Sequence, residues 1–322
     1  MTPSSRLRIV ATLPLVGPGG ERIDLWRTFV SHGVAELPPL LIDEADRTLR
    51  ATVALPRGRA RSVLVRHGED GSAGLHVEGQ APARGDAAAL ERTVRHILAF
   101  DEDLSEFYAI ARDDPALSWV THGAGRMIRS ATVFEEVVKT ICTTNCSWSA
   151  TERMTAALVE HLGTAAPGAP PSGPLGRTFP TAGAMASAPL AFYRDVVRAG
   201  YRGAYLRSLA RSVAEGSVDL ESLGSASRKE MPDDEVERRL LALPGVGPYA
   251  CAHVMMLIGR YSRLILDSWS RPKYAKVLGR RTLVPDAAIV RRFRRYGHYA
   301  GLAFWLFITR DWVEEPPPPQ RA

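Results

Sequence analysis

The stretch "LPGVGPYACAHVMMLIGRYSRLILD", residues 243–267, has the pattern of two helices joined by a glycine turn and followed by an aspartate. The first helix lies mostly before this stretch, over "DDEVERRLLAL", where charged and apolar residues recur at helical spacing. Pro244 ends this helix. Pro248 begins the second helix, because a proline is tolerated in a first turn. We therefore expect a helical hairpin over residues 234–260, with an aspartate of the preceding "DD" pair capping its first helix.

The turn of this hairpin places Gly245 and Gly247 beside the start of a helix. Backbone N–H groups in such a turn point outward and the helix dipole adds positive potential, so the turn suits a phosphate. The same pattern also fits two helices that only pack together. Asp267 has two interpretations as well: a helix N-cap, or a carboxylate with a chemical role.

The first part of the chain, residues 1–98, is predicted to form a small antiparallel β domain. Short, partly alternating runs are separated there by Gly, Pro and Asp residues. The expected strands are "RLRIVATLPL", "RTLRATVALP", "SVLVRHG" and "AGLHVEG". Because the rest of the chain is helical in pattern, the fold class is mainly α with a small N-terminal β domain, that is, α+β.

Residues 99–312 are predicted to form a helical body in two parts, because apolar residues recur there at steps of three and four. The segment 163–180, "GTAAPGAPPSGPLGRTFP", is rich in Pro and Gly and is predicted to be a long loop that joins the two halves. The last residues, 313–322, contain "EEPPPPQRA" and are predicted to be a disordered tail.

The charge is unevenly distributed along the 322 residues. The whole chain carries a net charge of +6, whereas residues 271–298 hold nine cations against one anion, so the remainder is slightly acidic. A local excess of basic residues indicates a polyanionic partner, although a solvated pair of basic helices has the same composition.

The remaining composition excludes several classes of protein. No apolar run reaches the roughly 18 residues of a membrane span, and the start of the chain lacks the apolar block of a signal peptide. We therefore expect no membrane partner and a cytoplasmic location. The three cysteines show no paired spacing, so a disulfide framework is not expected.

Several motifs in one order resemble the helix-hairpin-helix DNA glycosylase superfamily. "LPGVG" precedes the aspartate of "LILD" by the spacing of that family, with Gly247 20 residues before Asp267. "ICTTNCSWSATERMTAALVEHLG" is similar to the helix that carries a DNA-plugging residue. "AGYRGAYLRSLAR" and "YGHYAGLAFWLFITRD" resemble segments of 8-oxoguanine DNA glycosylases. The resemblance covers residues 101–312 and implies damaged double-stranded DNA as the partner, with the active site between two helical halves.

The resemblance assigns roles to individual residues. Asp267 is the catalytic carboxylate, which would stabilise an oxocarbenium-like sugar and position a water molecule. Asn145 would fill the space left by an extruded nucleotide, Tyr201 would wedge into the opposite strand, and Arg202 would contact the orphaned base. Without the family, the residues alone favour a helix N-cap for Asn145 and a packed aromatic for Tyr201.

The residue after Pro248 distinguishes two branches of the family. The 8-oxoguanine enzymes have there a lysine that forms a Schiff base and permits strand cleavage, whereas this chain has Tyr249. A phenol cannot form that imine, so the prediction is a monofunctional hydrolase. Lys273 could substitute for that lysine, but a solvated or phosphate-facing role suits it better.

An aromatic residue at position 249 resembles 3-methyladenine DNA glycosylase II, and electron-rich rings stack well on the positive charge of alkylated purines. His253 lies one turn further on the same helix face and either lines the pocket or packs in the core. Phe304 replaces a glutamine that reads oxidised guanine. Trp269 replaces a histidine, whose role would be either at the pocket edge or in a phosphate contact. These four aromatic residues form the predicted base pocket.

The family also binds a monovalent cation, sodium or potassium, through carbonyls of the hairpin, which correspond here to Leu241, Leu243 and Val246. No other cofactor is expected, and an iron-sulfur cluster is excluded because no cysteine follows Cys251. The prediction is a DNA glycosylase for alkylated purines that acts as a monomer. The alternatives are a glycosylase for oxidised or deaminated purines, and a protein that binds damaged DNA without catalysis.

Overall fold

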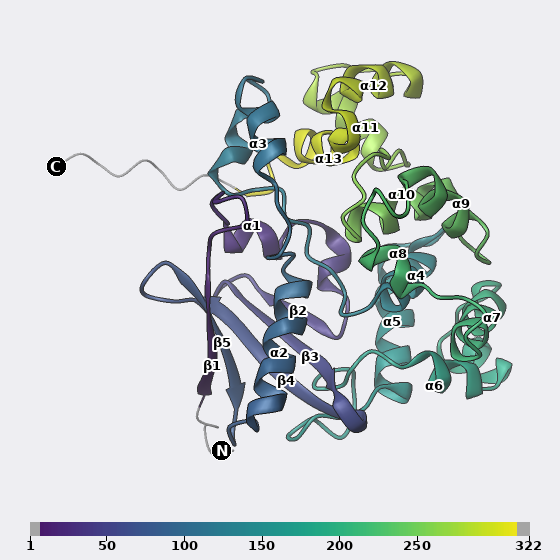
Figure 1. Cartoon of the computed structure of the whole chain (residues 1–322). Helices are drawn as coiled ribbons and strands as arrows, with labels where there is room; N and C mark the ends of the chain where they lie inside the picture. The colour runs from purple at the N-terminus through teal and green to yellow at the C-terminus, as the bar shows by residue number, and fades with distance from the viewer. Residues whose placement is uncertain (1–6, 314–322) are drawn as a thin grey trace.

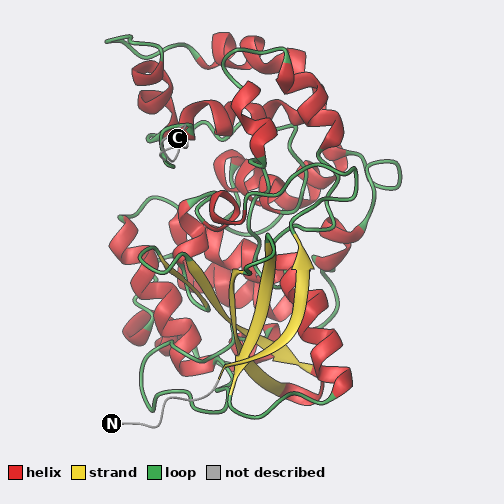
Figure 2. Cartoon of the chain, turned by 90° about the vertical axis from the view of Figure 1, so that its left-hand side faces the viewer, coloured by secondary structure: helices red, strands yellow, loops and turns green. Residues whose placement is uncertain are grey.

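A computed structural model describes residues 7–313. The N-terminal part is a five-stranded antiparallel sheet in the order β1-β5-β4-β3-β2. The strands lie together in the lower half of the molecule (Figures 1 and 2). Their bounds are Leu7–Pro14 (β1), Leu40–Asp43 (β2), Thr48–Leu55 (β3), Arg59–His67 (β4) and Ser72–Glu78 (β5).

Four of these strands coincide with the predicted ones, and β2 is the strand that the sequence pattern missed. It has four residues and follows Pro38 and Pro39, so its apolar alternation is too short to stand out from a turn. Helix α2 (Arg84–Ile97) covers one face of the sheet (Figure 1), where Leu90 and Val94 enter the same apolar core as the inward strand residues.

The helical body contains eleven further α-helices and a short π-helix in the described part of the chain. Two of the long α-helices, α4 and α5, begin where the sequence provides a cap: the Thr132 side chain accepts from the Glu135 amide, and Ser147 accepts from the Ala150 amide. The bounds are Ser105–Arg112 (α3), Val133–Thr143 (α4), Trp148–Leu162 (α5), Ala182–Ser187 (α6), Phe192–Val196 (π-helix), Arg202–Ala214 (α7), Glu221–Ser225 (α8), Asp233–Leu241 (α9), Pro248–Leu257 (α10), Ser270–Val277 (α11), Asp286–Phe293 (α12) and Ala300–Thr309 (α13).

Short helical segments connect these parts. Helix α1 and one 3-10 helix lie between the first two strands, a second 3-10 helix joins β3 to β4, a third follows α3, and a fourth precedes α13. Their bounds are Leu25–Phe29 (α1), Gly33–Glu36, Pro56–Gly58, Ser118–His122 and Arg294–Tyr299. Among residues 7–313, no helix is both long enough and apolar enough to cross a membrane.

The helical body has two apolar cores that share α10. One core is built from residues between Val133 and Ile258, and the other from residues 104–127 together with α11 to α13. Val254 of α10 is buried in the first core and Met256 in the second. This helix is therefore apolar on all sides because both its faces are covered.

The loop 163–180 does not join the two halves, so that expectation was wrong. Its flanking helices α5 and α6 both belong to the first core, where Leu158 and Met185 are buried together. The chain passes between the cores elsewhere, before α4 and within α10. A Pro/Gly-rich composition shows that a segment is a loop, but it does not show which elements the loop connects. The predicted tail lies outside the described residues, except for Val313.

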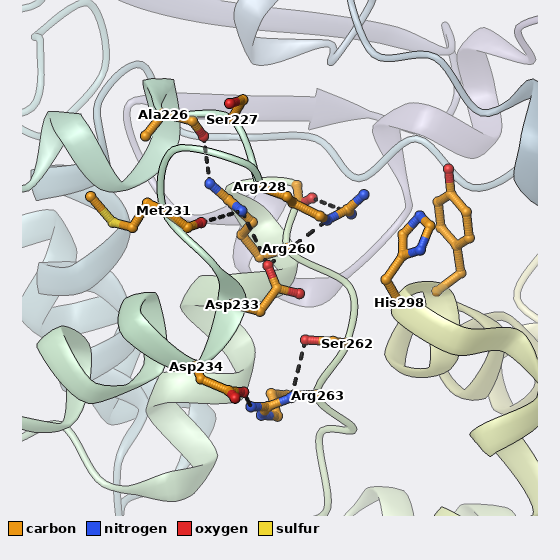
Figure 3. A network of polar contacts seen from close by, with 12 residues as sticks. Ala226, Ser227, Arg228, Met231, Asp233, Asp234, Arg260, Ser262, Arg263 and His298 are labelled. Carbon is orange, nitrogen blue, oxygen red and sulfur yellow. Dashed lines mark hydrogen bonds and ion pairs between the residues drawn. The ribbon is translucent and has the colours of Figure 1, made fainter.

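Two arginines after α10 hold the hairpin together (Figure 3). Arg260 donates to the Met231 carbonyl at 2.9 Å and to Asp233 Oδ1 at 3.1 Å. Arg263 pairs with Asp234 and with Glu237 at 2.7 Å. The predicted side-chain cap of α9 is consequently absent: Pro232 occupies the N-cap position, and both aspartate carboxylates bind these arginines instead.

Candidate active site at the start of α10

A cavity of about 610 Å³ opens at the N-terminal end of α10, beside the boundary of the two helical cores. Four segments that are far apart in the sequence line it: the end of α4, the start of α7, the hairpin turn, and the segment before α11. Six of the predicted site residues lie on its wall: Asn145, Tyr201, Gly245, Gly247, Tyr249 and Asp267. Their individual roles stay predictions.

Asp267 is held by a reciprocal pair of hydrogen bonds at the start of α11. Its Oδ1 accepts from the Ser270 amide at 2.6 Å and from the Trp269 amide at 2.9 Å, while its own amide donates to Ser270 Oγ at 2.9 Å. Its Oδ2 has no hydrogen-bond partner among the described residues. The carboxylate is thus fixed in position by one oxygen, as in a helix cap, and keeps the other oxygen for chemistry.

The hairpin turn also has free hydrogen-bonding groups. Gly245 has a φ of +83°, which favours glycine, and a Cβ there would lie 2.9 Å from the Tyr205 ring. Gly247 is the N-cap of α10. Within residues 7–313, neither of these two glycine amides has an acceptor. Free amides at a helix N-terminus attract an anion.

Tyr249 faces both the cavity and the interior. Its hydroxyl lies 3.3 Å from Thr143 Oγ1 and 3.5 Å from His253 Nδ1. Burial raises the pKa of Tyr249, the hydrogen bond to Thr143 lowers it, and the Asp267 carboxylate raises it further. The net shift is upward, so the side chain is a neutral phenol at physiological pH.

Asn145 projects from a turn that Arg202 holds in place. Asn145 has a φ of +47°, a conformation that asparagine tolerates better than most residues, and its Nδ2 lies 3.4 Å from the Tyr201 hydroxyl. The Arg202 guanidinium lies over the Tyr201 ring at 4.6 Å and donates to the Thr144 carbonyl. Tyr201 itself is 54% exposed.

No model of a protein family matches the sequence, and no curated protein matches it. Solved structures do. A 3-methyladenine DNA glycosylase from Archaeoglobus fulgidus matches with a TM-score of 0.66 and 21% identity, over 91% of this chain and 97% of the other. An 8-oxoguanine glycosylase/lyase from Clostridium acetobutylicum, in its apo form, matches with a TM-score of 0.67 and 18% identity, over 90% and 94% of the two chains.

The same Clostridium enzyme, in complex with double-stranded DNA containing cytosine opposite 8-oxoG, matches with a TM-score of 0.67 and 19% identity, over 91% and 93% of the chains. This chain has the fold of DNA glycosylases. The predicted fold class is confirmed. The alignments cannot be restricted to the helical body, because they cover 90–91% of this chain.

The glycosylase fold places two of the predicted pocket residues elsewhere. Phe304 is completely buried in α13, in an aromatic cluster with Phe293 and Tyr274 at ring distances of 5.4 and 5.9 Å. Trp269 packs against Trp305 and Trp312, each at 5.6 Å, and lies outside the cavity. The prediction that Phe304 lines this cavity is wrong, because other aromatic rings cover it completely. Trp269 is 42% exposed but is not part of the cavity wall either.

Three other predicted residues also lie off the cavity wall. His253 is buried behind Tyr249. Arg202 is 7% exposed and donates its hydrogen bonds to backbone carbonyls, so it supports the Asn145 turn in place of meeting an orphaned base. Lys273 Nζ pairs with Asp311 at 2.7 Å, and this ion pair neutralises the charge that we assigned to DNA.

Nine of the residues that line the cavity were not predicted to do so, among them Tyr205 and Arg271. Tyr205 lies one helical turn after Tyr201, and Arg271 lies four residues after Asp267 and pairs with Asp286 at 2.8 Å. The spacing of four residues was visible in the sequence and places each of them on the same helical face as a predicted residue. It could have identified both.

The basic segment is largely available to a polyanion. Of its nine cations, Arg271, Lys273 and Arg295 form ion pairs. The other six are exposed and have no ion pair with any residue that the structure describes. They are Lys276, Arg280, Arg281, Arg291, Arg292 and Arg294.

The carbonyl set expected for a monovalent cation surrounds the hairpin turn. The Leu243 carbonyl accepts from the Val246 amide at 3.2 Å, and because a carbonyl has two lone pairs, one remains for a cation. Leu241 ends α9, so its carbonyl belongs to the last turn of a helix, where carbonyls lack intrahelical partners. The donor chemistry therefore fits a hard monovalent ion.

Proposed function

We propose that the protein is a DNA glycosylase that hydrolyses the N-glycosidic bond of an extruded, damaged purine. One observation carries the proposal: Asp267, whose carboxylate is fixed through Oδ1 and has no described partner for Oδ2, lines the same cavity as Gly245 and Gly247, whose amides are free. The neighbours' activities, which their names give as 3-methyladenine and 8-oxoguanine glycosylase, support this class of reaction.

The arrangement provides what the reaction needs. Breaking an N-glycosidic bond develops positive charge on the sugar, which a nearby carboxylate stabilises, and the same carboxylate can orient the attacking water. The hairpin amides would hold a phosphate of the strand, and the exposed Asn145 and Tyr201 would occupy the space of the extruded nucleotide. Binding through phosphates predicts that the logarithm of the affinity falls linearly with the logarithm of the salt concentration. The expected slope is about −0.9 for each phosphate that the protein neutralises.

We further propose hydrolysis without strand cleavage. Tyr249 lacks the amine that a Schiff base requires, and the Lys273 amine is tied to Asp311. The test is borohydride reduction during turnover, which traps an imine between the enzyme and DNA. We expect no covalent complex from this protein, whereas a glycosylase/lyase assayed in parallel forms one. A trapped complex that disappears in the Lys273→Met variant would overturn this part of the proposal.

The preferred substrate is proposed to be an alkylated purine, because the neutral Tyr249 ring stacks on a positively charged base. A panel of duplexes carrying 3-methyladenine, 1,N6-ethenoadenine, hypoxanthine or 8-oxoguanine tests this, with abasic sites revealed by alkali. We expect the fastest release for 3-methyladenine. Release of 8-oxoguanine alone would support the rival substrate class and reject ours.

A protein that binds damaged DNA without catalysis is the second candidate function. The Asp267→Asn variant separates the two, because asparagine keeps the Oδ1 acceptor that caps α11 and loses only the charge. As an enzyme, this variant should retain binding while excision falls by about a thousandfold or more. If the wild type binds lesions tightly and excises none of the panel, the binding function holds instead.

The remaining features of the proposal follow from the same site. The partner would be damaged double-stranded DNA, a sodium or potassium ion would be held by the carbonyls of Leu241, Leu243 and Val246, and no redox cofactor would be used. We propose that the protein acts as a monomer on DNA in the cytoplasm. Gel filtration of the protein with and without a duplex tests whether it is a monomer.

A further inference from the structure

His32, from the N-terminal part of the chain, is buried next to the candidate active site and has one unpaired ring nitrogen. Its Nε2 lies 2.7 Å from the Ile128 carbonyl. A carbonyl only accepts, so Nε2 must carry the hydrogen and Nδ1 must be a bare acceptor. Nδ1 is buried and has no partner among the described residues. Burial lowers the pKa of His32 to about 3, so the ring stays neutral.

His253 of α10 is the next ring, and it also has an unpaired nitrogen. The two ring centroids are 6.1 Å apart and the rings are nearly perpendicular, at 88°. His253 Nδ1 lies 3.5 Å from the Tyr249 hydroxyl, while Nε2 is buried without a partner within the described chain. Burial lowers the pKa of His253 to about 4, so this ring is neutral too and carries a single hydrogen.

Only one position of that hydrogen makes the two rings complementary. If Nδ1 carried it, the bare Nε2 of His253 and the bare Nδ1 of His32 would be two buried acceptors without a donor, on neighbouring rings. If Nε2 carries it, His253 becomes the donor that the His32 acceptor lacks. The two rings then meet after a small rotation or through one bridging water.

The choice determines how Tyr249 uses its hydroxyl. Thr143 Oγ1 donates its own hydrogen to the Thr140 carbonyl at 2.7 Å, so towards Tyr249 it can only accept. With His253 bare at Nδ1, the Tyr249 hydrogen has two competing acceptors, Thr143 and His253. With a hydrogen on His253 Nδ1, only Thr143 would remain.

We infer that His32 is a positioning residue, which holds His253 as its Nε2–H tautomer and so turns the Tyr249 hydroxyl hydrogen towards His253 Nδ1. The chain of donors then runs from Tyr249 through His253 and His32 to the Ile128 carbonyl. The Tyr249 oxygen offers only lone pairs to a base in the cavity. A base edge that donates a hydrogen bond, such as an amino group, is favoured over a carbonyl oxygen at the same place. This last consequence rests on the proposed function.

Two substitutions of His32 separate positioning from packing. Gln places an amide near the position of Nε2 and keeps the bond to the Ile128 carbonyl, but it lacks a group at Nδ1. Asn places an amide near Nδ1 and loses the bond to Ile128. A purely structural His32 would therefore tolerate His32→Gln best, whereas the inferred role is rescued by His32→Asn. His122→Gln, at an exposed histidine, is the matched control.

The direct readout is the tautomer of His253, measured by two-bond proton–nitrogen NMR on the full chain labelled at histidine nitrogens. We expect His32 and His253 both as Nε2–H in the wild type and in His122→Gln. In His32→Gln the His253 signals should shift towards the Nδ1–H form, and His32→Asn should restore them. This measurement needs no substrate, so it tests the inference even if the protein excises no base.

The second readout is the ratio of kcat/KM for 3-methyladenine to that for hypoxanthine, which has a carbonyl in place of the amino group. We expect His32→Gln to lower this ratio roughly tenfold, the factor of one hydrogen bond, and His32→Asn to change it less. An Nδ1–H tautomer in the wild type, or an unchanged His253 tautomer in His32→Gln, would overturn the inference. Equal effects of Gln and Asn on the ratio would do so as well.

Discussion

The cavity beside α10 contrasts with the buried junction, which we define as two ion pairs: Glu21 with Arg126, and Glu135 with Lys139. Both regions are polar and lie at boundaries between cores. In the buried junction every charge has a partner: Arg126 pairs with Glu21 at 2.6 Å and Lys139 with Glu135 at 2.6 Å, all at most 4% exposed. In the cavity the Asp267 carboxylate keeps one oxygen free of any described partner. Burying an unpaired charge is costly, so free groups persist only where water or a ligand reaches them.

This contrast separates two kinds of variant. Removing a partner in the buried junction should lower stability and leave the chemistry of the folded protein intact. Removing a side chain from the cavity should weaken binding or excision and leave stability intact. The predictions below test this separation, beginning with the largest expected change in the free energy of unfolding.

Arg126→Met should cause the largest loss of stability. The guanidinium donates to Glu21 and to the Glu102 carbonyl, and Glu21 also accepts from the Leu104 amide, so the variant leaves a buried carboxylate without its cation. We expect the free energy of unfolding to fall by about 3–5 kcal/mol in urea denaturation. Arg238→Met, which breaks an exposed pair, should change the free energy of unfolding very little. Similar losses in the two variants would contradict the contrast.

Arg260→Met should lower the free energy of unfolding by a smaller amount, about 3 kcal/mol. The backbone carbonyls and the Asp233 carboxylate that lose their donor in this variant lie nearer the surface. The change loosens the start of α9 and not the cavity wall itself. At a temperature where the variant is folded, we expect the rate of excision per folded molecule to be within about threefold of wild type, a change of under 1 kcal/mol. A much larger loss of activity would show that the hairpin clamp also positions the catalytic groups.

The fold could be predicted further from the sequence than the site could. The hairpin, the strands and most helices follow from local spacing and from caps such as Thr132, which act within a few residues. Asp267 and Tyr249 were located by the same hairpin. The prediction for Phe304 failed because helical periodicity indicates which face of a helix is buried but not which residues cover it. Only the packed structure shows that Phe293 and Tyr274 cover Phe304.

The pairing of His32 with His253 was beyond sequence reasoning for a related reason. The two residues are more than 200 positions apart, and nothing in the local pattern of either one indicates the other. The same holds for Arg126 and Glu21, which are separated along the chain by strands β2 to β5. Polar contacts between distant segments depend on tertiary packing, whereas caps and turns depend on neighbours along the chain.

Glu136→Gln should change how stability depends on pH. Burial raises the pKa of Glu136 from 4.5 to about 7, against the lowering effect of Lys139. Between these two values the folded protein binds more protons than the unfolded chain, so its stability falls as pH rises through this window. Glutamine does not titrate. We expect the variant to gain about 2 kcal/mol relative to wild type between pH 5 and pH 8.

Denaturation of both proteins at the two pH values measures this difference, and contributions from other groups such as His32 cancel in it. Because the comparison is between pH values, any constant cost of the substitution also cancels. A difference that does not change with pH would mean that Glu136 is ionised in the folded protein throughout, as a third charge beside Glu135 and Lys139.

Asn145→Gly should have the smallest effect on stability and a clear effect on binding. Asn145 has a positive φ, which glycine adopts without strain, and its side chain is exposed, with a single 3.4 Å contact to Tyr201. We expect the free energy of unfolding to change by less than about 0.5 kcal/mol. Asn145→Ala would add backbone strain and is the less suitable variant.

The readout is the ratio of affinities for a duplex with an abasic site and an undamaged duplex, measured by fluorescence anisotropy at fixed salt. An abasic duplex already has the space that Asn145 would fill, so removing the side chain should lower that ratio by roughly tenfold, or about 1.4 kcal/mol. The affinity for undamaged DNA, which depends on phosphate contacts, should stay within about twofold. An equal loss for both duplexes would place Asn145 among the phosphate contacts, and a large loss of stability would place it with the buried junction.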